Sequence, residues 1–307
     1  MKRKLVRQGK TTLMVSLPNN WVKRNNLQKG AEVSLNEDNN NILISTEQKK
    51  IRRKTVITLT SDTEPSVRTA IINAYRSGYD IIRINFKNKN QHILIDQIIN
   101  SYAIGLEMTK IDKLYCILES ITEPEQQRFD VVFRRIFYNV QQLLEFTSER
   151  LKGKEQHINY ENIVLKIHCY DNFCRRVISK RNEPSYRAGL YWSFLGLISQ
   201  AQRELYHLNI FLNSNKVIFK NEKLFGHFKE VIELISSAYA KKNLEEIEKV
   251  HDLKKKIKRT LLYPLMIKGR NEENIVISHL VTSLRLFHLT CSPLTGLILK
   301  PEKITWE

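Results

Sequence analysis

Cysteine, glycine and proline are scarce in this chain of 307 residues, which contains 4 Cys, 10 Gly and 7 Pro. The cysteines form no C-x-x-C pair and have no zinc-finger spacing, so we expect reduced thiols in an intracellular protein. So few glycines and prolines argue against a β-sandwich and against long disordered linkers. There is no run of about 18 apolar residues, and the first residues lack the apolar stretch of a secretory signal. We therefore expect a cytoplasmic protein without stable membrane insertion.

Positive charge is abundant and unevenly spread, since 50 Lys and Arg against 32 Asp and Glu give a formal net charge of +18. Residues 1–55 carry 13 basic and 4 acidic side chains, a net of +9, whereas residues 56–121 carry 7 of each. Residues 122–307 carry 30 basic and 21 acidic side chains, again +9 but over a much longer stretch. A dense positive segment attracts polyanions, of which nucleic acid is the commonest. The alternative interpretation of residues 1–55 is a solvated basic tail without a binding role.

The first 45 residues have the pattern of a folded unit rather than of a tail. Leu13, Val15 and Leu17 alternate with residues that face the other way, which is the period of a half-buried strand. Pro18 ends that strand and suits the first turn of a short helix. The predicted elements are strands at 4–7, 12–17, 33–35 and 42–44, a helix at 19–25, and turns at 9–10, 29–30 and 36–41.

A β-β-α-β-β unit of about 45 residues has too little core to be stable alone, and strand exchange between two identical chains is one way to complete it. The string S-L-P-x-x-W-V…L-x-K-G-x-x-V-x-L, which begins at Ser16, resembles the swapped-hairpin domain of the AbrB/MazE/SpoVT family. The resemblance implies a homodimer through this domain that binds double-stranded DNA with basic residues of the first strand, the following turn and the short helix. Those positions are occupied here by Lys4, Arg7, Lys10, Lys23 and Arg24. Taken singly, each is alternatively a solvated surface charge.

The middle of the chain predicts a small α/β unit. Residues 49–54 (K-K-I-R-R-K) form a basic connector that is either a solvated linker or a further DNA contact. Strands are predicted at 55–59, 80–86, 106–109 and 114–118, and helices are predicted between Pro65 and the C′ glycine Gly78 and over 92–105. No glycine-rich phosphate loop accompanies them, so a nucleotide enzyme is not expected. We interpret this segment as a dimerisation or spacing element.

From residue 123 onward helical periodicity dominates and predicts six helices, near 125–152, 160–181, 184–213, 222–242, 244–268 and 271–292, with Pro293 closing the last. The whole layout resembles the archaeal PhoU-like phosphate-uptake regulators, which implies two three-helix bundles here. The predicted fold is therefore multi-domain α+β. It consists of an AbrB-like swapped-hairpin β-barrel (1–48), a small α/β spacer (55–121) and an all-α PhoU-like pair of three-helix bundles (122–300).

PhoU domains carry acidic pairs that bind metal clusters, because carboxylates at i and i+4 share one helix face. The match is poor in this chain. Cys174 stands where an aspartate is expected, and Tyr206 replaces the aspartate before His207. Glu248 and Asp252 do have the spacing, but a solvated helix face paired with neighbouring lysines is the favoured interpretation. We expect no cofactor, with Glu248 and Asp252 as weak candidates for a metal ion.

Two further clusters have ordinary interpretations. Residues 254–259 (K-K-K-I-K-R) are either the solvated side of a helix or a contact for acidic headgroups or an acidic partner. His168, Cys169, Asp171 and Cys174 do not share one helix face, so four metal ligands would not converge there. We interpret the two cysteines as small buried hydrophobes.

The sequence contains no Ser/His/Asp set, nucleotide loop or ligand-spaced metal triad, so the protein is not expected to be an enzyme. We predict a DNA-binding transcriptional regulator, and the resemblance implies that it acts on phosphate uptake or homeostasis. The alternative is a PhoU-like interaction protein that modulates a phosphate transporter component or its ATPase, with DNA binding secondary. The concentration of charge in residues 1–55 favours the regulator.

Overall fold

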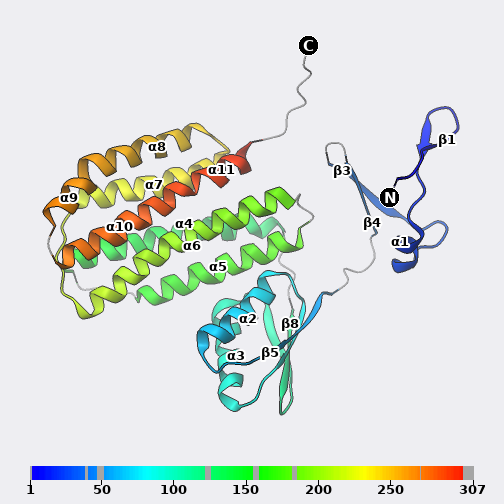
Figure 1. The fold of residues 1–307 in the computed structure, drawn as a ribbon, viewed down its shortest axis with the longest axis horizontal. Coiled ribbons are helices and arrows are strands. Elements are labelled where there is room, and N and C mark those ends of the chain that lie inside the picture. The colour runs from blue at the N-terminus through cyan, green and yellow to red at the C-terminus, as the bar shows by residue number, and fades with distance from the viewer. Residues whose placement is uncertain are drawn as a thin grey trace. The chain divides into compact units, whose positions relative to one another are not determined.

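A computed structural model describes residues 2–38, 41–46, 52–121, 126–154, 159–181, 185–269 and 271–299. The chain divides into two compact units, residues 1–52 and residues 53–307. Most of the chain is helical, and the strands all precede the long helices (Figure 1). The predicted domain bounds within the second unit stay a prediction.

The N-terminal unit contains two separate strand pairs and one short helix. β1 (Val6–Gln8) pairs antiparallel with β2 (Thr12–Met14), α1 (Asn19–Arg24) follows, and β3 (Val33–Asp38) pairs antiparallel with β4 (Asn41–Thr46). This is the predicted order of elements. β2 is shorter than predicted, whereas β3 and β4 run longer because residues assigned to the turn continue the ladder as far as Asp38 and Asn41. Residues 39–40 of that predicted turn lie outside the described residues.

The second unit begins with a four-stranded mixed sheet. Its strand order is β5 (Lys54–Thr58), β6 (Ile81–Asn85), β8 (Tyr115–Ser120) and β7 (Leu106–Ile111). β5 and β6 are parallel, and the remaining pairs are antiparallel. A parallel pair needs a crossover connection, and α2 (Glu64–Arg76) provides it. The last two strands of the sequence prediction, 106–109 and 114–118, correspond to the paired strands β7 and β8.

Two helices cover one face of this sheet. α2 and α3 (Lys89–Tyr102) pack on it through fully buried Ile71, Ile82, Ile84 and Ile95. The alternating strand residues Val56 and Arg83 face outward and are exposed. Gly78 follows α2 with a φ of +82°, the left-handed conformation that glycine adopts without a Cβ clash, which confirms its predicted C′ position.

The rest of the second unit is helical, and its elements lie close to the predicted helices. α4 (Gln126–Leu151), α5 (Tyr160–Lys180), α6 (Ser185–Ser214) and α7 (Glu222–Lys241) are single helices. The predicted fifth helix is α8 (Glu245–Ile257), a π-helical turn η1 (Lys258–Leu262) and α9 (Tyr263–Lys268) in succession. The predicted sixth is α10 (Glu272–Leu289) followed by α11 (Cys291–Ile298).

Pro293 does not close the sixth helix. α10 ends at Leu289, and Pro293 lies in the first turn of α11. Since the N–H groups of a first helical turn have no partner within the helix, the missing N–H of proline removes no hydrogen bond there. Proline therefore marks the beginning of a helix at this position.

The helices share one continuous hydrophobic core rather than two. Its members come from every helix between α4 and α11 except the short α9, which packs against it. Phe133 lies near its centre, with its ring centroid 4.3 Å from that of Tyr239 and 5.7 Å from that of Phe194. Because these three residues belong to α4, α7 and α6, one aromatic cluster joins both halves of the helical part. The predicted PhoU-like pair of three-helix bundles is not confirmed.

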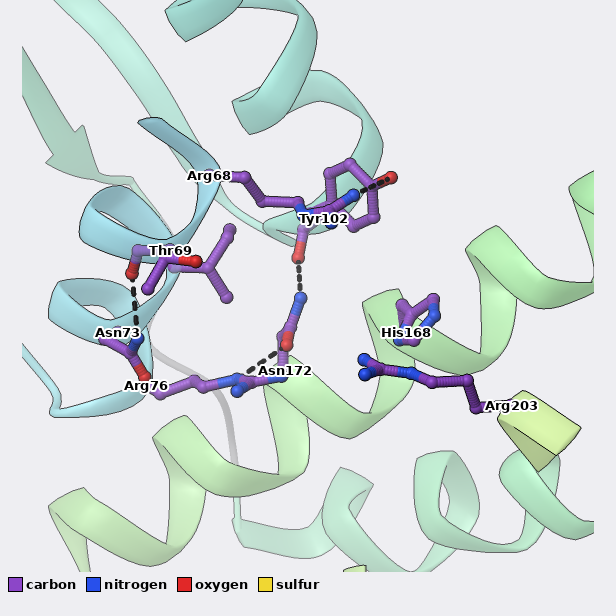
Figure 2. A pocket seen from close by; sticks show the side chains of 9 residues that line it. Arg68, Thr69, Asn73, Arg76, Tyr102, His168, Asn172 and Arg203 are labelled. Atoms are coloured by element: carbon purple, nitrogen blue, oxygen red, sulfur yellow. Dashed lines mark hydrogen bonds between the residues drawn. The ribbon is translucent and has the colours of Figure 1, made fainter. Parts of the chain in front are cut away.

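Two polar clusters join the α/β layer to helix α5. In the first, Arg76 of α2 donates from Nε to Asn172 Oδ1 at 2.7 Å, and Asn172 donates from Nδ2 to the carbonyl of Tyr102 at 2.8 Å (Figure 2). Arg76 Nη2 also lies 3.2 Å from Asp171 Oδ2. Helix α5 is thus hydrogen-bonded to both α2 and the end of α3.

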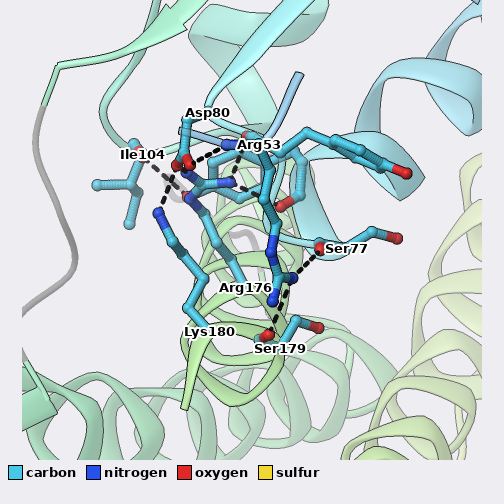
Figure 3. Close-up of polar contacts among 9 residues, drawn as sticks. Arg53, Ser77, Asp80, Ile104, Arg176, Ser179 and Lys180 are labelled. Atoms are coloured by element: carbon cyan, nitrogen blue, oxygen red, sulfur yellow. Dashed lines mark hydrogen bonds and ion pairs between the residues drawn. The ribbon is translucent and has the colours of Figure 1, made fainter. Parts of the chain in front are cut away.

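The second cluster surrounds the buried carboxylate of Asp80 (Figure 3). Arg176 Nη2 of α5 donates to Asp80 Oδ1 at 2.7 Å, and the ammonium of Lys180 contacts the same oxygen. The backbone N–H of Arg53 donates to Asp80 Oδ2 at 3.0 Å. Arg176 also donates from Nη1 to the carbonyl of Tyr79 at 2.7 Å. A buried charge with this many partners fixes the loop before β6 against α5.

One segment of the described chain, Glu272–Ile298, is long and apolar enough by length and composition to cross a membrane. It comprises α10 and α11, and Leu280, Leu284, Phe287 and Leu294 on these helices are buried in the helical core. Burial in the core accounts for part of its apolar composition.

Candidate nucleic-acid interface

The first strand pair, with its turn and the residues just before it, carries three of the predicted DNA contacts. Gly9 follows β1 with a φ of +74°, and Lys10 lies beside it in the turn that leads to β2. Arg7 is the central residue of β1 and pairs with Leu13 of β2. Lys4 precedes β1 by two residues. All three basic side chains are exposed.

Helix α1 carries the other two. The carbonyl of Pro18 accepts hydrogen bonds from the N–H groups of Trp21 and Val22, which begins the helix. Trp21 and Val22 are half-buried, so the opposite side of the helix is solvent-facing. Lys23 and Arg24 lie there in the last turn, where positive charge interacts favourably with the helix dipole.

The five predicted residues have little local neutralisation. Among the described residues none of them forms an ion pair, and Arg24 donates only to the carbonyl of Asn20 in its own helix, from Nε at 3.3 Å. Lys2, Arg3 and Lys29, which are not among the five predicted residues, are exposed as well. The density of positive charge in residues 1–55 is the sequence feature that indicates these three residues. An exposed, unpaired set of cations attracts phosphate oxygens without first breaking protein contacts.

Several apolar side chains on or next to the strands of this unit are exposed to solvent. Leu5 is 63% exposed, Leu13 60%, Leu35 63% and Ile42 65%, and no described residue of the unit is buried. Exposed apolar residues at strand positions are unfavourable in water, and a surface of this kind is typical of protein interfaces. This agrees with the expectation that the unit has too little core of its own.

The basic connector is divided by the structure. Residues 49–51 lie outside the described residues. Arg53 belongs to the second unit, where its guanidinium donates to the carbonyls of Ser77 and Ser179 at 3.4 Å each. Lys54 begins β5. Arg53 therefore has a structural role as well as a charge.

The weak metal candidates lie on the exposed face of α8. Glu248 and Asp252 are both exposed, and Asp252 Oδ1 is 3.7 Å from the ammonium of Lys255. Within the described part of the chain, no group of three or more His, Cys, Asp and Glu side chains could hold a metal ion. Of the two cysteines interpreted as buried, Cys174 is fully buried and Cys169 is half-buried, and burial raises the pKa of Cys169 to about 11.

The basic strand, turn and helix of the N-terminal unit, together with its uncovered apolar strand residues, are typical of small nucleic-acid-binding domains that work in pairs. A comparison with protein families agrees, because residues 6–54 match the family described as antidote-toxin recognition MazE, bacterial antitoxin. These residues form a MazE/AbrB-type antitoxin-like domain, and such domains commonly bind DNA and dimerise. No curated protein and no solved structure matched the chain. The matched segment ends at residue 54, so the PhoU-like nature of the helical part stays a prediction.

Proposed function

We propose that this protein is a cytoplasmic, non-enzymatic regulator of transcription that binds double-stranded DNA through its N-terminal unit. The observation that carries the proposal is the match of residues 6–54 to the MazE antitoxin family in the segment where positive charge is densest. Lys4, Arg7, Lys10, Lys23 and Arg24 contact the DNA. Their exposure and their lack of ion pairs among the described residues support that role.

The DNA-binding form is a homodimer built from two N-terminal units. Support comes from the exposed apolar residues on the strands of both pairs, Leu13 and Ile42 among them, which a second copy would bury. Because Arg7 of β1 is paired with Leu13 of β2, the two side chains lie on the same face of the strand pair, so the DNA contact lies next to a residue that the second copy would cover. Dimerisation therefore places two sets of basic residues on one duplex.

Binding to a duplex should fall steeply with salt. Five basic residues per chain reach on the order of ten phosphates in a dimer, so the slope of log affinity against log salt should approach about −9. Titration of labelled duplex DNA at several salt concentrations measures the slope, and sedimentation of the complex counts the chains. We expect two chains per bound duplex. Affinity that does not change with salt would contradict the electrostatic contact, and a bound monomer would contradict the dimer.

The proposal also names the process that the protein regulates. On the resemblance of the helical layout to PhoU-like regulators alone, we propose that it is phosphate uptake. Sequencing the genomic fragments that co-purify with the protein tests this, and fragments next to phosphate-transporter genes are expected. Enrichment of unrelated loci would leave DNA binding intact and remove the phosphate role, and a tight complex with a transporter component without DNA would favour the alternative interaction protein.

A further inference from the structure

A cleft opens in the second unit where α2 and the end of α3 face α5 and α6. It consists of two adjoining cavities of about 170 Å³ and about 520 Å³. The two cavities share Arg68, Tyr102, His168 and Arg203 in their walls. Figure 2 shows the side chains of Arg76 and Arg203 extending toward one another in this space, and Arg68 reaching from α2 to the hydroxyl of Tyr102, to which it donates from Nη1 at 3.1 Å. Residues far apart in the chain thus form one cavity wall.

The cleft holds more positive than negative charge. Arg76 shares the carboxylate of Asp171 with Arg175, whose Nε lies 2.8 Å from the same oxygen. Arg68 Nη1 is 3.1 Å from Glu64 Oε1, a pair that is more than a third exposed and therefore weak. Arg203 makes no ion pair or hydrogen bond among the described residues. Apart from these partners, Glu161 in the larger cavity is the one carboxylate in the described walls.

The basic groups act on one another. Burial lowers the pKa of the Arg76 guanidinium, and the charges of Arg175, Arg203 and Arg68 lower it further, although Asp171 opposes them. Burial likewise lowers the pKa of His168 to about 4, and the same cleft arginines add to that effect against Asp171. His168 is therefore neutral at pH 7. Three guanidinium groups in one cleft, with too few carboxylates to neutralise them, repel one another. A bound anion reduces this repulsion.

The chemistry of the walls selects the kind of anion. Guanidinium groups bind phosphate oxygens with paired N–H donors, and Arg203 has all of its donors available among the described residues. The larger cavity adds Val164, Leu165 and Tyr206, which are apolar or flat and suit an organic group. Its volume lies in the range of about 300–1,000 Å³ typical of small-molecule sites. A cleft of this size accommodates one small molecule and not a duplex.

We propose that this cleft binds a small phosphorylated molecule, whose phosphoryl group is held by Arg76, Arg203 and Arg68 and whose organic part occupies the larger cavity. The bound molecule touches α2, α3, α5 and α6 at once, so it ties the α/β layer to the helical part. This gives the second unit a ligand of its own. The proposal does not depend on DNA binding by the N-terminal unit.

Calorimetric titration of the full chain tests the site with four probes at constant ionic strength. The probes are inorganic phosphate, ribose 5-phosphate, adenosine 5′-monophosphate and adenosine without phosphate. We expect the two phosphate esters to bind more tightly than inorganic phosphate, and adenosine not to bind. Failure of all three phosphorylated probes to bind would overturn the proposal, as would adenosine binding equal to that of its monophosphate. Esters that bind no better than inorganic phosphate would overturn the assignment of the larger cavity.

The matched variants are Arg203→Gln in the cleft and Arg134→Gln on α4. Both arginines are exposed helix residues, and Arg134 donates only to the carbonyl of Asp130 in its own helix. Loss of one charge-assisted contact should weaken ester binding about 10- to 100-fold in Arg203→Gln and leave Arg134→Gln unchanged. Equal loss in both variants would indicate general charge attraction and overturn the site. A variant Arg203→Gln that loses duplex affinity but keeps ester affinity would also overturn it.

Discussion

The double variant Arg7→Glu/Lys10→Glu should bind duplex DNA about a thousandfold more weakly than the wild-type protein. Each chain loses two phosphate contacts, so a dimer loses four, and at about 1 kcal/mol each the loss is about 4 kcal/mol. Repulsion between the new carboxylates and the phosphates adds to it. The salt slope should also become shallower by about 0.9 for each contact removed. Fluorescence anisotropy with a labelled duplex measures both quantities.

A matched control separates a local contact from general attraction to a chain of net charge +18. Lys256→Glu/Arg259→Glu makes the same charge change at exposed positions of the second unit. This control should lower duplex affinity only slightly. If it lowers affinity as much as Arg7→Glu/Lys10→Glu does, the N-terminal unit is not the specific interface. Unchanged far-UV circular dichroism in both variants would show that neither result comes from unfolding.

The second large effect concerns stability. Asp80→Asn should lower the free energy of unfolding of the second unit by about 3–5 kcal/mol, because it leaves the buried guanidinium of Arg176 without its counter-charge. The side chains of Arg176 and Asp80 are only 1% and 5% exposed, so water cannot replace the lost interaction. The substitution keeps the shape of the side chain, which isolates the effect of charge. Urea unfolding followed by circular dichroism gives the free energy.

The same carboxylate predicts a pH dependence. Burial raises the pKa of Asp80, but hydrogen bonds from Lys180 and Arg53 and the charges of Lys180 and Arg176 outweigh it and hold the pKa below its ordinary value. A carboxyl group with a depressed pKa stabilises the fold above the unfolded pKa and loses this contribution as the pH falls through the folded pKa. The stability difference between wild type and Asp80→Asn should therefore be constant near pH 7 and shrink below about pH 4.

Asp252→Asn provides the control for Asp80→Asn. Asp252 faces Lys255 on the surface at 3.7 Å, with both side chains more than two-thirds exposed, and exposed pairs of this kind add little stability. We expect no measurable change in its urea midpoint. If Asp80→Asn is as harmless as Asp252→Asn, or if its effect persists unchanged at low pH, the cluster around Asp80 does not stabilise the joint between the α/β layer and α5.

Local patterns located most of the elements, because they depend on neighbouring residues. The alternation at Leu13 identified β2, the glycines Gly9 and Gly78 were placed in turns with positive φ, and helical periodicity located α4 to α8. Element ends were less predictable. Pro293 was assigned to the end of a helix and lies near the beginning of one, since the same missing N–H suits both places.

The two candidate sites also differ in how far the sequence could predict them. The predicted DNA contacts lie within a short segment, so charge density and motif spacing could identify Lys4, Arg7, Lys10, Lys23 and Arg24 together. The cleft arginines could not be found, because Arg68 and Arg203 belong to different domains of the predicted layout and nothing local links them. In the cleft His168 lies with Arg68, Tyr102 and Arg203, which belong to three other helices, so no local pattern links them to it.

The sequence by itself determined the uneven charge distribution, the order of strands and helices, and the basic character of the first unit, because each of these depends on residue type and spacing alone. Tertiary structure decided which distant residues meet. It joined the helices from α4 to α11 in one hydrophobic core, brought Arg176 into contact with Asp80 from 96 positions away in the chain, and gathered Arg68, Arg76 and Arg203 around one cleft. Packing of whole helices sets these contacts, and no short-range pattern encodes the angle and offset at which two helices pack.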